Sequence, residues 1–396
     1  MNLNRGRPVT SMPGPSIIPD RVLSAMHMAM PNIYEGDLVE TSSSVFEDLP
    51  AIARTRGRAF MAISNGHGAW EMALTNTLRR GDKVLILESG RFAIGWGEQA
   101  RRLGAEVEIL HSDERVPVDP NALEECLRAD RGHEIKAILV VQVDTASGVW
   151  NDIAALRRAI DTADHPALFM VDCIASLGCV EYLMDEWQVD VTVGGSQKGL
   201  MVPPGLGLVW ASPKAMAAHE RADMRTAYWD WTARLSPEAH YLRYCGTAPI
   251  QHIYAMRAAL DMIAEEGLEA IWARHKIFAD AVRAAVAAWS KPDGLEFNIL
   301  DPNHRSNSTT TVLSGSVDSE RLRAICENNA GLTLGIGLGE FAGRSFRIGH
   351  MGHLNPPTVL GVLATVEAGL AAIDAPVGGS GAAAAAKVIA DALKSG

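Results

Sequence analysis

Short apolar runs alternate with longer amphipathic stretches between residues 58 and 210. Runs such as Lys136–Val143 and Ala167–Val171 are almost wholly apolar, which is typical of strands buried on both faces of a parallel sheet. The alternation predicts an α/β fold with a mainly parallel, doubly wound sheet covered by helices on both faces. The predicted strands are Arg58–Ile63, Val84–Leu87, Glu106–Leu110, Lys136–Val143, Ala167–Val171, Val189–Val193 and Leu206–Trp210.

The pattern changes after residue 250. Two long amphipathic helices are predicted, and the second, Leu268–Trp289, is expected to lead into a smaller α+β domain. We divide the chain into an extended N-terminal arm (1–19), a large domain (20–265), a small C-terminal domain (266–375) and a Gly/Ala-rich linker with a peripheral helix (376–396). The arm contains Met12-Pro13-Gly14-Pro15, which cannot form a helix.

Composition narrows the class of protein. Of the 396 residues, 47% are hydrophobic and 21% are charged, as in ordinary globular proteins. The net charge is −11 and no dense Lys/Arg run interrupts it, so neither a nucleic-acid groove nor an anionic membrane surface is expected as a partner. No apolar run approaches the length of a membrane span, and no signal peptide follows Arg5 and Arg7. Five scattered cysteines without metal-ligand spacing indicate a reducing, cytoplasmic environment and no metal site.

One lysine follows a predicted strand directly. Val189–Val193 leads into two glycines and then Ser196-Gln197-Lys198, so Lys198 is held near the core on a short loop. A lysine in this position can form a Schiff base with a carbonyl cofactor, although a polar surface loop is the other interpretation.

Further polar residues follow other predicted strands, where the ligand crevice of an α/β sheet lies. They include Thr145 and Asp172. Pyridoxal phosphate needs a lysine and also a carboxylate that keeps its ring nitrogen protonated, and Lys198 with Asp172 could supply both. Asp172 could equally be a helix cap. Gly66-His67-Gly68 opens a helix after a strand, which suits an anion but is also found in plain turns.

These motifs together resemble those of the class V, fold type I aminotransferases of the serine/alanine/aspartate–glyoxylate group. The loop at 194–205, Gly-Gly-Ser-Gln-Lys-Gly-Leu-Met-Val-Pro-Pro-Gly, is similar to the loop that carries the family's cofactor lysine, and the resemblance covers about residues 11–375. It implies an aminotransferase that holds pyridoxal 5′-phosphate (PLP) on Lys198. It also implies a homodimer with shared active sites, or a higher oligomer.

The resemblance assigns a role to each matching residue. Catalysis falls to Lys198 and Asp172, and the expected contacts to PLP are Gly66, His67 and Gly68 at the phosphate, Trp96 stacked on the ring, Thr145 at the ring oxygen, Gln197 beside the lysine, and Tyr244 and Thr247 from the other subunit. Arg347 is expected to clamp the substrate carboxylate, with Arg344 as the local rival. Core packing remains open for Trp96, Tyr244 and Thr247, helix capping for His67, and a surface ion pair for Arg347.

The substrate loop departs from many relatives. Tyr34-Glu35-Gly36-Asp37 stands where they carry a His-Arg pair, so Tyr34 and Glu35 are candidate substrate contacts. The expected donor is serine, alanine or aspartate, and the acceptor is glyoxylate or pyruvate. The alternative is a pyridoxamine–pyruvate aminotransferase, which has a similar loop but a glutamate where this chain has Asn65. A cysteine desulfurase-like lyase would need a cysteine within 335–343, where there is none, and a non-enzymatic PLP-fold protein would not need the intact set of site residues.

Overall fold

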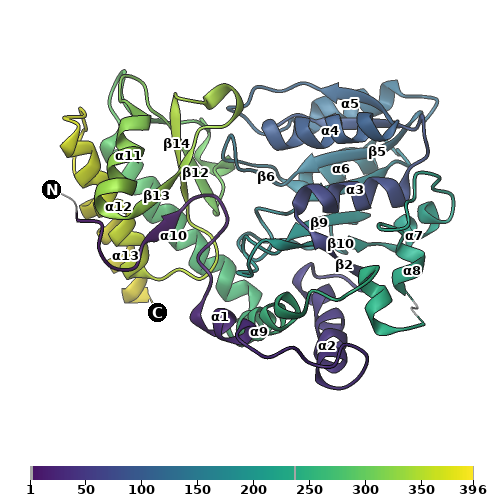
Figure 1. The fold of residues 1–396 in the computed structure, drawn as a ribbon. Helices are drawn as coiled ribbons and strands as arrows, with labels where there is room; N and C mark the ends of the chain where they lie inside the picture. Colours follow the sequence, from purple (N-terminus) through teal and green to yellow (C-terminus); the bar gives the residue numbers. More distant parts are fainter. Residues whose placement is uncertain (1–2, 236–237, 396) are drawn as a thin grey trace.

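The structure, a computed structural model, describes residues 3–235 and 238–395. It has two lobes, a large α/β lobe and a smaller α+β lobe, joined by the long helix α10 (Leu268–Trp289) (Figure 1). The first residues of α10 pack in the core of the large lobe, whereas residues from Phe278 onward pack in the core of the small lobe. One helix therefore belongs to both cores and links the two lobes.

The large lobe is built on a seven-stranded sheet of order β2-β10-β9-β8-β5-β3-β4. All neighbouring strands are parallel except β10, which is antiparallel to both of its neighbours. Residues 196–204 between β9 and β10 are too few for a parallel crossover, which needs a dozen residues or more. The predicted fold class is confirmed. The strands are β2 (Arg58–Ser64), β3 (Lys83–Leu87), β4 (Glu106–Leu110), β5 (Ile135–Val141), β8 (Leu168–Asp172), β9 (Val191–Gly195) and β10 (Gly205–Ala211).

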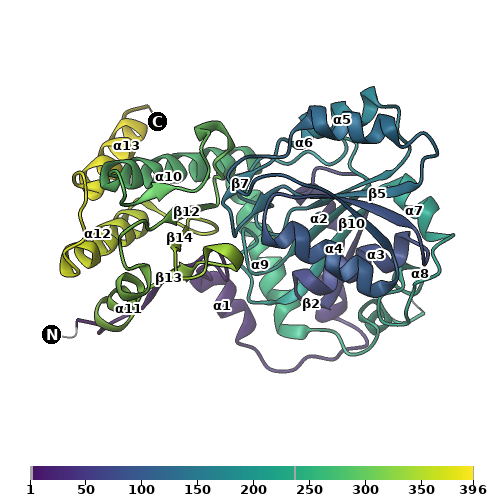
Figure 2. The ribbon, with the colours of Figure 1, turned by 90° about the horizontal axis from the view of Figure 1, so that it is seen from above.

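Helices cover both faces of this sheet (Figure 2). One face packs against α3 (Gly66–Thr77), α4 (Arg91–Leu103) and α7 (Pro213–His219). The other packs against α2 (Asp37–Ile52), α5 (Pro120–Ala129), α6 (Ile153–Thr162) and α9 (Ile250–Glu266). Shorter elements are α1 (Asp20–Met26), β6 (Val143–Asp144), β7 (Val149–Trp150), α8 (Trp231–Leu235) and the 3₁₀ turns η1 (His240–Tyr244), η2 (Pro302–His304) and η3 (Gly339–Phe341).

The small lobe has a five-stranded sheet of order β1-β13-β14-β12-β11. Its strands are β1 (Val9–Ser11), β11 (Glu296–Phe297), β12 (Thr309–Leu313), β13 (Leu332–Ile336) and β14 (Ser345–Gly349), with α11 (Ser319–Ala330) and α12 (Pro356–Ala372) packed against them. Strand β1 comes from the N-terminal arm and runs parallel to β13. The purple arm in Figure 1 thus crosses the small lobe before it reaches α1.

The C-terminal helix contributes side chains to the small lobe's core. In α13 (Gly381–Ser395), Ala385 and Ile389 are buried in the small lobe's core. Glu367 anchors the linker because its carboxylate accepts hydrogen bonds from Ser380 Oγ at 2.8 Å and from the Ala382 amide at 2.9 Å. Small alanine side chains allow α13 to lie close to its neighbours.

Within residues 3–235 and 238–395, no helix combines the length and the apolar character that crossing a bilayer requires. The same residues contain no group of three or more His, Cys, Asp or Glu side chains placed to hold a metal ion.

Candidate active site

A cavity of about 270 Å³ lies beyond the carboxyl ends of strands in the large sheet. The loops after β2, β5, β8 and β9 meet there, where ligand crevices of open α/β sheets form. Six of the predicted site residues line it together: Gly66, His67, Thr145, Asp172, Gln197 and Lys198. Residues far apart in sequence are adjacent here because parallel strands all present their carboxyl ends at one edge of the sheet.

Lys198 is held by the N-terminal arm. Its Nζ donates a hydrogen bond to the carbonyl oxygen of Pro13, and Ser16 Oγ donates to the Lys198 carbonyl oxygen at 2.7 Å. A β-carbon at Gly14 would lie 2.4–2.5 Å from the end of the lysine side chain. Burial, with a smaller contribution from the charge of Arg347, lowers the pKa of Lys198 to about 8, although Asp172 opposes the shift. The interpretation of Lys198 as part of a polar surface loop therefore does not fit, since the side chain is partly buried and lines the cavity.

Asp172 ends β8 and is 3% exposed. Its carboxylate accepts hydrogen bonds from Trp70 Nε1 at 2.8 Å and from the Ile174 amide at 2.7 Å. Burial raises the pKa of Asp172 to about 7, although both hydrogen bonds favour the charged form. Because its pKa is about 7, the Asp172 carboxyl would ionise readily if a cation, such as a protonated pyridine nitrogen, lay beside it.

The glycines of the α3 turn are required by packing. A β-carbon at Gly66 would lie 2.3 Å from Ile174 Cδ1, and one at Gly68 would lie 2.7 Å from Ser64 Cβ. The side chain of Asn65 caps the helix by accepting hydrogen bonds from the amides of His67 and Gly68. The His67 side chain is exposed, and its ring lies 4.6 Å from that of Trp70. An anion bound at this turn would compete with Asn65 for the same two amides.

The structure places Phe92, rather than Trp96, in the cavity wall. Trp96 is fully buried and stacks on Trp70 with ring centroids 5.9 Å apart, so it lies behind the residues that line the cavity. Phe92 and Trp96 are four residues apart on α4, and their spacing in the sequence does not show which of the two faces the cavity. The available signal was the position of Phe92 in the first turn of α4, beside Gly90.

Arg347 of the small lobe bonds to a residue of the cavity wall. It is buried on β14, and its Nη1 donates to the carbonyl oxygen of Thr145 at 2.7 Å while its Nε donates to that of Ile336 at 2.6 Å. Burial lowers the pKa of Arg347 to about 10. Arg344 is exposed and donates to a nearby carbonyl group of the small lobe, so only Arg347 is directed toward the cavity-lining Thr145.

Gln197 also lines the cavity, and its Oε1 is buried without a hydrogen-bond partner among the described residues. Buried amide atoms are normally paired, so this one marks a place where a polar ligand group would fit.

The remaining predicted contacts lie away from this cavity. Tyr244 is 1% exposed and its hydroxyl contacts Ser42, which places the side chain in its own subunit's core. Thr247 is exposed. Tyr34 is 71% exposed and Glu35 is exposed, on the loop before α2. Within a single subunit, none of these four residues lines the cavity around Lys198.

Comparison with known proteins decides the family. The profile of the class V aminotransferases matches residues 60–339. A serine–glyoxylate aminotransferase of Methylorubrum extorquens is 40% identical over 373 residues, covering 92% of this chain and 91% of the relative. An L-aspartate–glyoxylate aminotransferase of Paracoccus denitrificans is 38% identical over 379 residues, 94% of each chain. This chain is a class V aminotransferase. The structure of a pyridoxamine–pyruvate aminotransferase from Mesorhizobium loti superposes with a TM-score of 0.89 at 27% identity, over 99% of this chain and all of that one.

Class V aminotransferases use PLP, and the cavity of this aminotransferase suits that cofactor. Lys198 presents an amine with a lowered pKa, Asp172 presents a buried carboxyl, and Gln197 Oε1 is an unpaired polar atom in the same wall. A planar aromatic ring would find aromatic and aliphatic side chains in Phe92 and Ile174. The donor set therefore fits the carbonyl, the ring nitrogen and the polar substituents of PLP.

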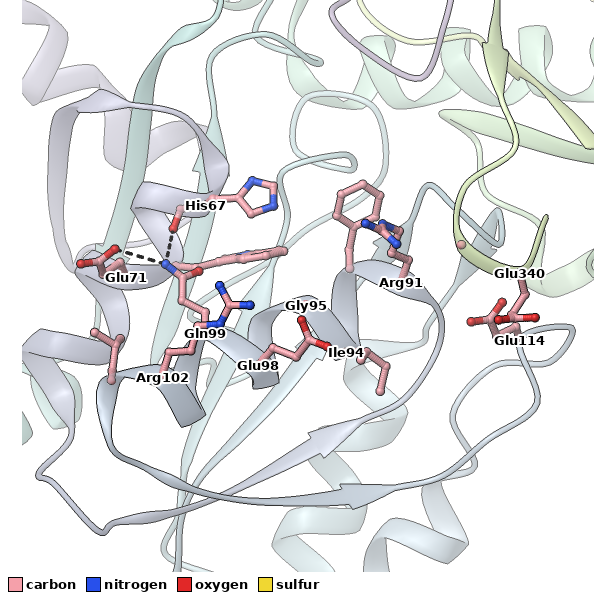
Figure 3. Close-up of a pocket in the computed structure, with 14 residues that line it drawn as sticks. His67, Glu71, Arg91, Ile94, Gly95, Glu98, Gln99, Arg102, Glu114 and Glu340 are labelled. Carbon is pink, nitrogen blue, oxygen red and sulfur yellow. Dashed lines mark hydrogen bonds between the residues drawn. The ribbon is translucent and has the colours of Figure 1, made fainter. Parts of the chain in front are cut away.

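A second cavity of about 620 Å³ adjoins the first (Figure 3). The two share His67, Trp70 and Phe92. Gln99 joins α4 to the α3 turn here, because its Nε2 donates to the His67 carbonyl oxygen at 3.1 Å and to Glu71 at 3.3 Å. The chamber has a charged lining: Arg91, Arg102, Glu71, Glu98, Glu114 and Glu340. This class V enzyme therefore has a second cavity with a strongly charged lining next to the cavity at Lys198.

Proposed function

We propose that this aminotransferase transfers the amino group of a small amino acid, serine, aspartate or alanine, to glyoxylate or pyruvate. The observation that carries the proposal is that Lys198 and Asp172 line one cavity, while Arg347 of the small lobe donates a hydrogen bond to the backbone of Thr145 in the wall of that cavity. The relatives at 38–40% identity, whose names specify serine or aspartate with glyoxylate, support the choice of substrates.

When PLP is bound, it supplies an electron sink for the bond broken at the donor's Cα. Lys198 Nζ would then have two tasks: it would hold the cofactor and, once displaced by the donor, it would take the proton from the donor's Cα and deliver it to the cofactor carbon that receives the amino group. Its pKa of about 8 suits both directions, because the neutral amine and the ammonium are both populated near neutral pH. The carbonyl oxygen of Pro13 can hold the amine between these steps.

Asp172 would act on the ring nitrogen of the cofactor, and Arg347 would act on the carboxylate of the substrate. Asp172, ionised beside the ring nitrogen, keeps that nitrogen protonated. Arg347 has the planar donor geometry that a carboxylate requires and, being buried, attracts it strongly. Its bonds to the carbonyl oxygens of Thr145 and Ile336 fix the guanidinium before substrate arrives, so less freedom is lost on binding.

A pyridoxamine–pyruvate aminotransferase is the second candidate, because such an enzyme superposes on nearly the whole chain. A free pyridoxamine donor would have to occupy the cavity itself. The exposed Tyr34 and Glu35 lie outside the cavity of their own subunit, so they support this candidate only through a second subunit. A cysteine desulfurase activity is disfavoured because Cys326 is buried on α11 and residues 335–343 contain no cysteine.

We further place the enzyme in the cytoplasm as a homodimer with shared active sites. Support comes from Tyr244 and Thr247, whose sequence pattern resembles that of family members with phosphate contacts from the partner. The exposed Thr247 could make such a contact, whereas the buried Tyr244 would have to leave its contact with Ser42.

Replacement of the lysine tests the proposal. Lys198→Ala should abolish transamination and the visible absorption band of lysine-bound PLP, because no other amine lines the cavity in the described part of the chain. Lys214→Ala is the matched control, since Lys214 is an exposed lysine that pairs with Asp190. Wild-type holoenzyme mixed singly with serine, aspartate, alanine and pyridoxamine then identifies the donor by the change in the cofactor's spectrum. Turnover by purified Lys198→Ala would exclude the proposal.

A further inference from the structure

We propose that Asp144 is the positioning residue of this site: its carboxylate aligns Phe92 and Thr145 against the cofactor and braces Arg347. This role rests on the placement of PLP in the Lys198 cavity. Asp144 itself does not line that cavity.

The carboxylate of Asp144 connects two separate chain segments. One oxygen, Oδ2, accepts hydrogen bonds from the amides of Phe92 at 2.8 Å and Ala93 at 3.2 Å, in the first turn of α4. The other, Oδ1, accepts from the Ala146 amide at 2.9 Å, in its own turn. Since Asp144 is fully buried, these bonds are shielded from water. The charge also complements the positive end of the α4 dipole.

Gly90 lies too close to the Asp144 carboxylate to carry a side chain without displacing it. Its φ is +150°, and a β-carbon there would lie 2.6 Å from Asp144 Cγ and 2.8 Å from both carboxylate oxygens. The start of α4 therefore approaches the carboxylate with no room for a side chain. Any shift of the carboxylate must move the amide of Phe92, and with it the aromatic ring in the cavity wall.

The turn that contains Asp144 also positions Thr145 and Arg347. Thr145 follows Asp144 directly, lines the cavity, and accepts the hydrogen bond from Arg347 Nη1 through its carbonyl oxygen. Asp144 also lies close enough to Arg347 for its charge to raise the pKa of the guanidinium, against the effect of burial. The Asp144 carboxylate thus helps to determine the positions of Phe92, Thr145 and Arg347.

A purely structural helix cap would have different consequences. An asparagine at position 144 offers one acceptor oxygen and a side-chain NH₂, so at least one of the three backbone amides would lose its partner. If Asp144 only stabilised α4, this loss would lower the unfolding temperature and leave the folded site unchanged. If it positions the site, the folded variant must hold the cofactor less tightly and in a different orientation.

The test compares holoenzyme carrying Asp144→Asn with the matched control Asp190→Asn. Asp190 is also buried and accepts a hydrogen bond from a backbone amide, that of Phe169 at 2.9 Å, but it precedes the amino end of β9, whereas the cavity lies beyond the carboxyl ends of the strands. The measurements are the dissociation constant of PLP, the visible circular dichroism of bound PLP, and the unfolding temperature. We expect Asp144→Asn to weaken PLP binding about ten-fold or more and to reduce the visible dichroism, while Asp190→Asn changes only the unfolding temperature.

Gly90→Ala is a second test of the proposal, because it keeps the charge of Asp144 but displaces the carboxylate. It should weaken PLP binding and reduce the dichroism in the same way. Wild-type PLP affinity and dichroism in folded Asp144→Asn would overturn the proposal. So would a failure of both variants to fold while Asp190→Asn folds, since that would make the role structural. These readouts need only bound PLP, so they remain decisive even if every donor tested for the proposed function is inactive.

Discussion

Trp70 connects the aromatic residues of the site to Asp172. Its indole N–H donates to Asp172, its ring stacks on Trp96, and Phe92 and His67 pack at its edges. Trp96 Nε1, by contrast, is buried without a partner among the described residues. The aromatic residues thus form two layers: Trp70 and Phe92 in the cavity wall and Trp96 behind them.

This layering gives a prediction that separates the two aromatics of α4. Phe92→Ala should weaken PLP binding about ten-fold, because it removes the ring that lines the cavity. Trp96→Phe should leave PLP affinity within about two-fold of wild type and lower the free energy of unfolding by about 1–3 kcal/mol, as a core truncation does. Fluorescence titration of PLP and denaturant unfolding measure the two effects. A larger loss of PLP affinity in Trp96→Phe than in Phe92→Ala would contradict the assignment.

Among the elements, the N-terminal arm has a role that its sequence did not reveal. Strand β1 holds the arm on the small lobe, Pro13 accepts the Lys198 hydrogen bond, and the Ser16 amide donates to the Gln197 carbonyl oxygen at 2.9 Å. The proline-rich composition correctly excluded a helix. It could not indicate β1, because a three-residue strand has no periodicity of its own and depends on pairing with β13, more than 300 residues away.

Gly14 tests the function of the arm. Gly14→Ala would place a β-carbon against the Lys198 side chain at a position with φ of +94°, so the lysine must move. We expect the transamination rate to fall about 100-fold, since a shift of roughly 1 Å in a reacting group costs this much. Gly6→Ala is the matched control: its φ is +112°, which gives a similar backbone penalty, but nothing lies within 4 Å of the added carbon. Equal rates in the two variants would show that the arm does not position Lys198.

On the scale of the whole molecule, the site lies where the two lobes meet. The turn at 144–148 belongs to the large lobe, yet Arg347, Thr311 and Asn298 of the small lobe donate hydrogen bonds to its carbonyl oxygens. The sequence predicted the large sheet, Lys198, Asp172 and Arg347 from local patterns and resemblance. It could not predict which side chain of α4 faces the cavity, or that α13 completes the small core, because both depend on packing between distant segments.

The buried carboxyl groups of the site also affect the stability of the whole molecule. Burial raises the pKa of Asp172 to about 7, well above its ordinary value of 3.8. Between these two pH values the folded protein without PLP binds a proton that the unfolded chain releases. Stability from Asp172 is therefore fully present below pH 4 and is lost as the pH rises toward and through 7. Buried histidines such as His275, whose pKa is lowered to about 4, act in the opposite direction over part of this range.

Comparison of wild type with Asp172→Asn isolates the carboxyl, because the histidine contributions are common to both proteins. We expect the free energy of unfolding of PLP-free wild type to fall relative to that of Asp172→Asn as the pH rises from 4 to 7, by up to about 1.4 kcal/mol per pH unit. Urea unfolding at four pH values measures this difference. PLP should reverse the trend in wild type, because a ring nitrogen beside Asp172 favours the ionised carboxyl, so stabilisation by PLP should be larger at pH 8 than at pH 5. A difference between the two proteins that does not change with pH would show that Asp172 is already ionised without the cofactor.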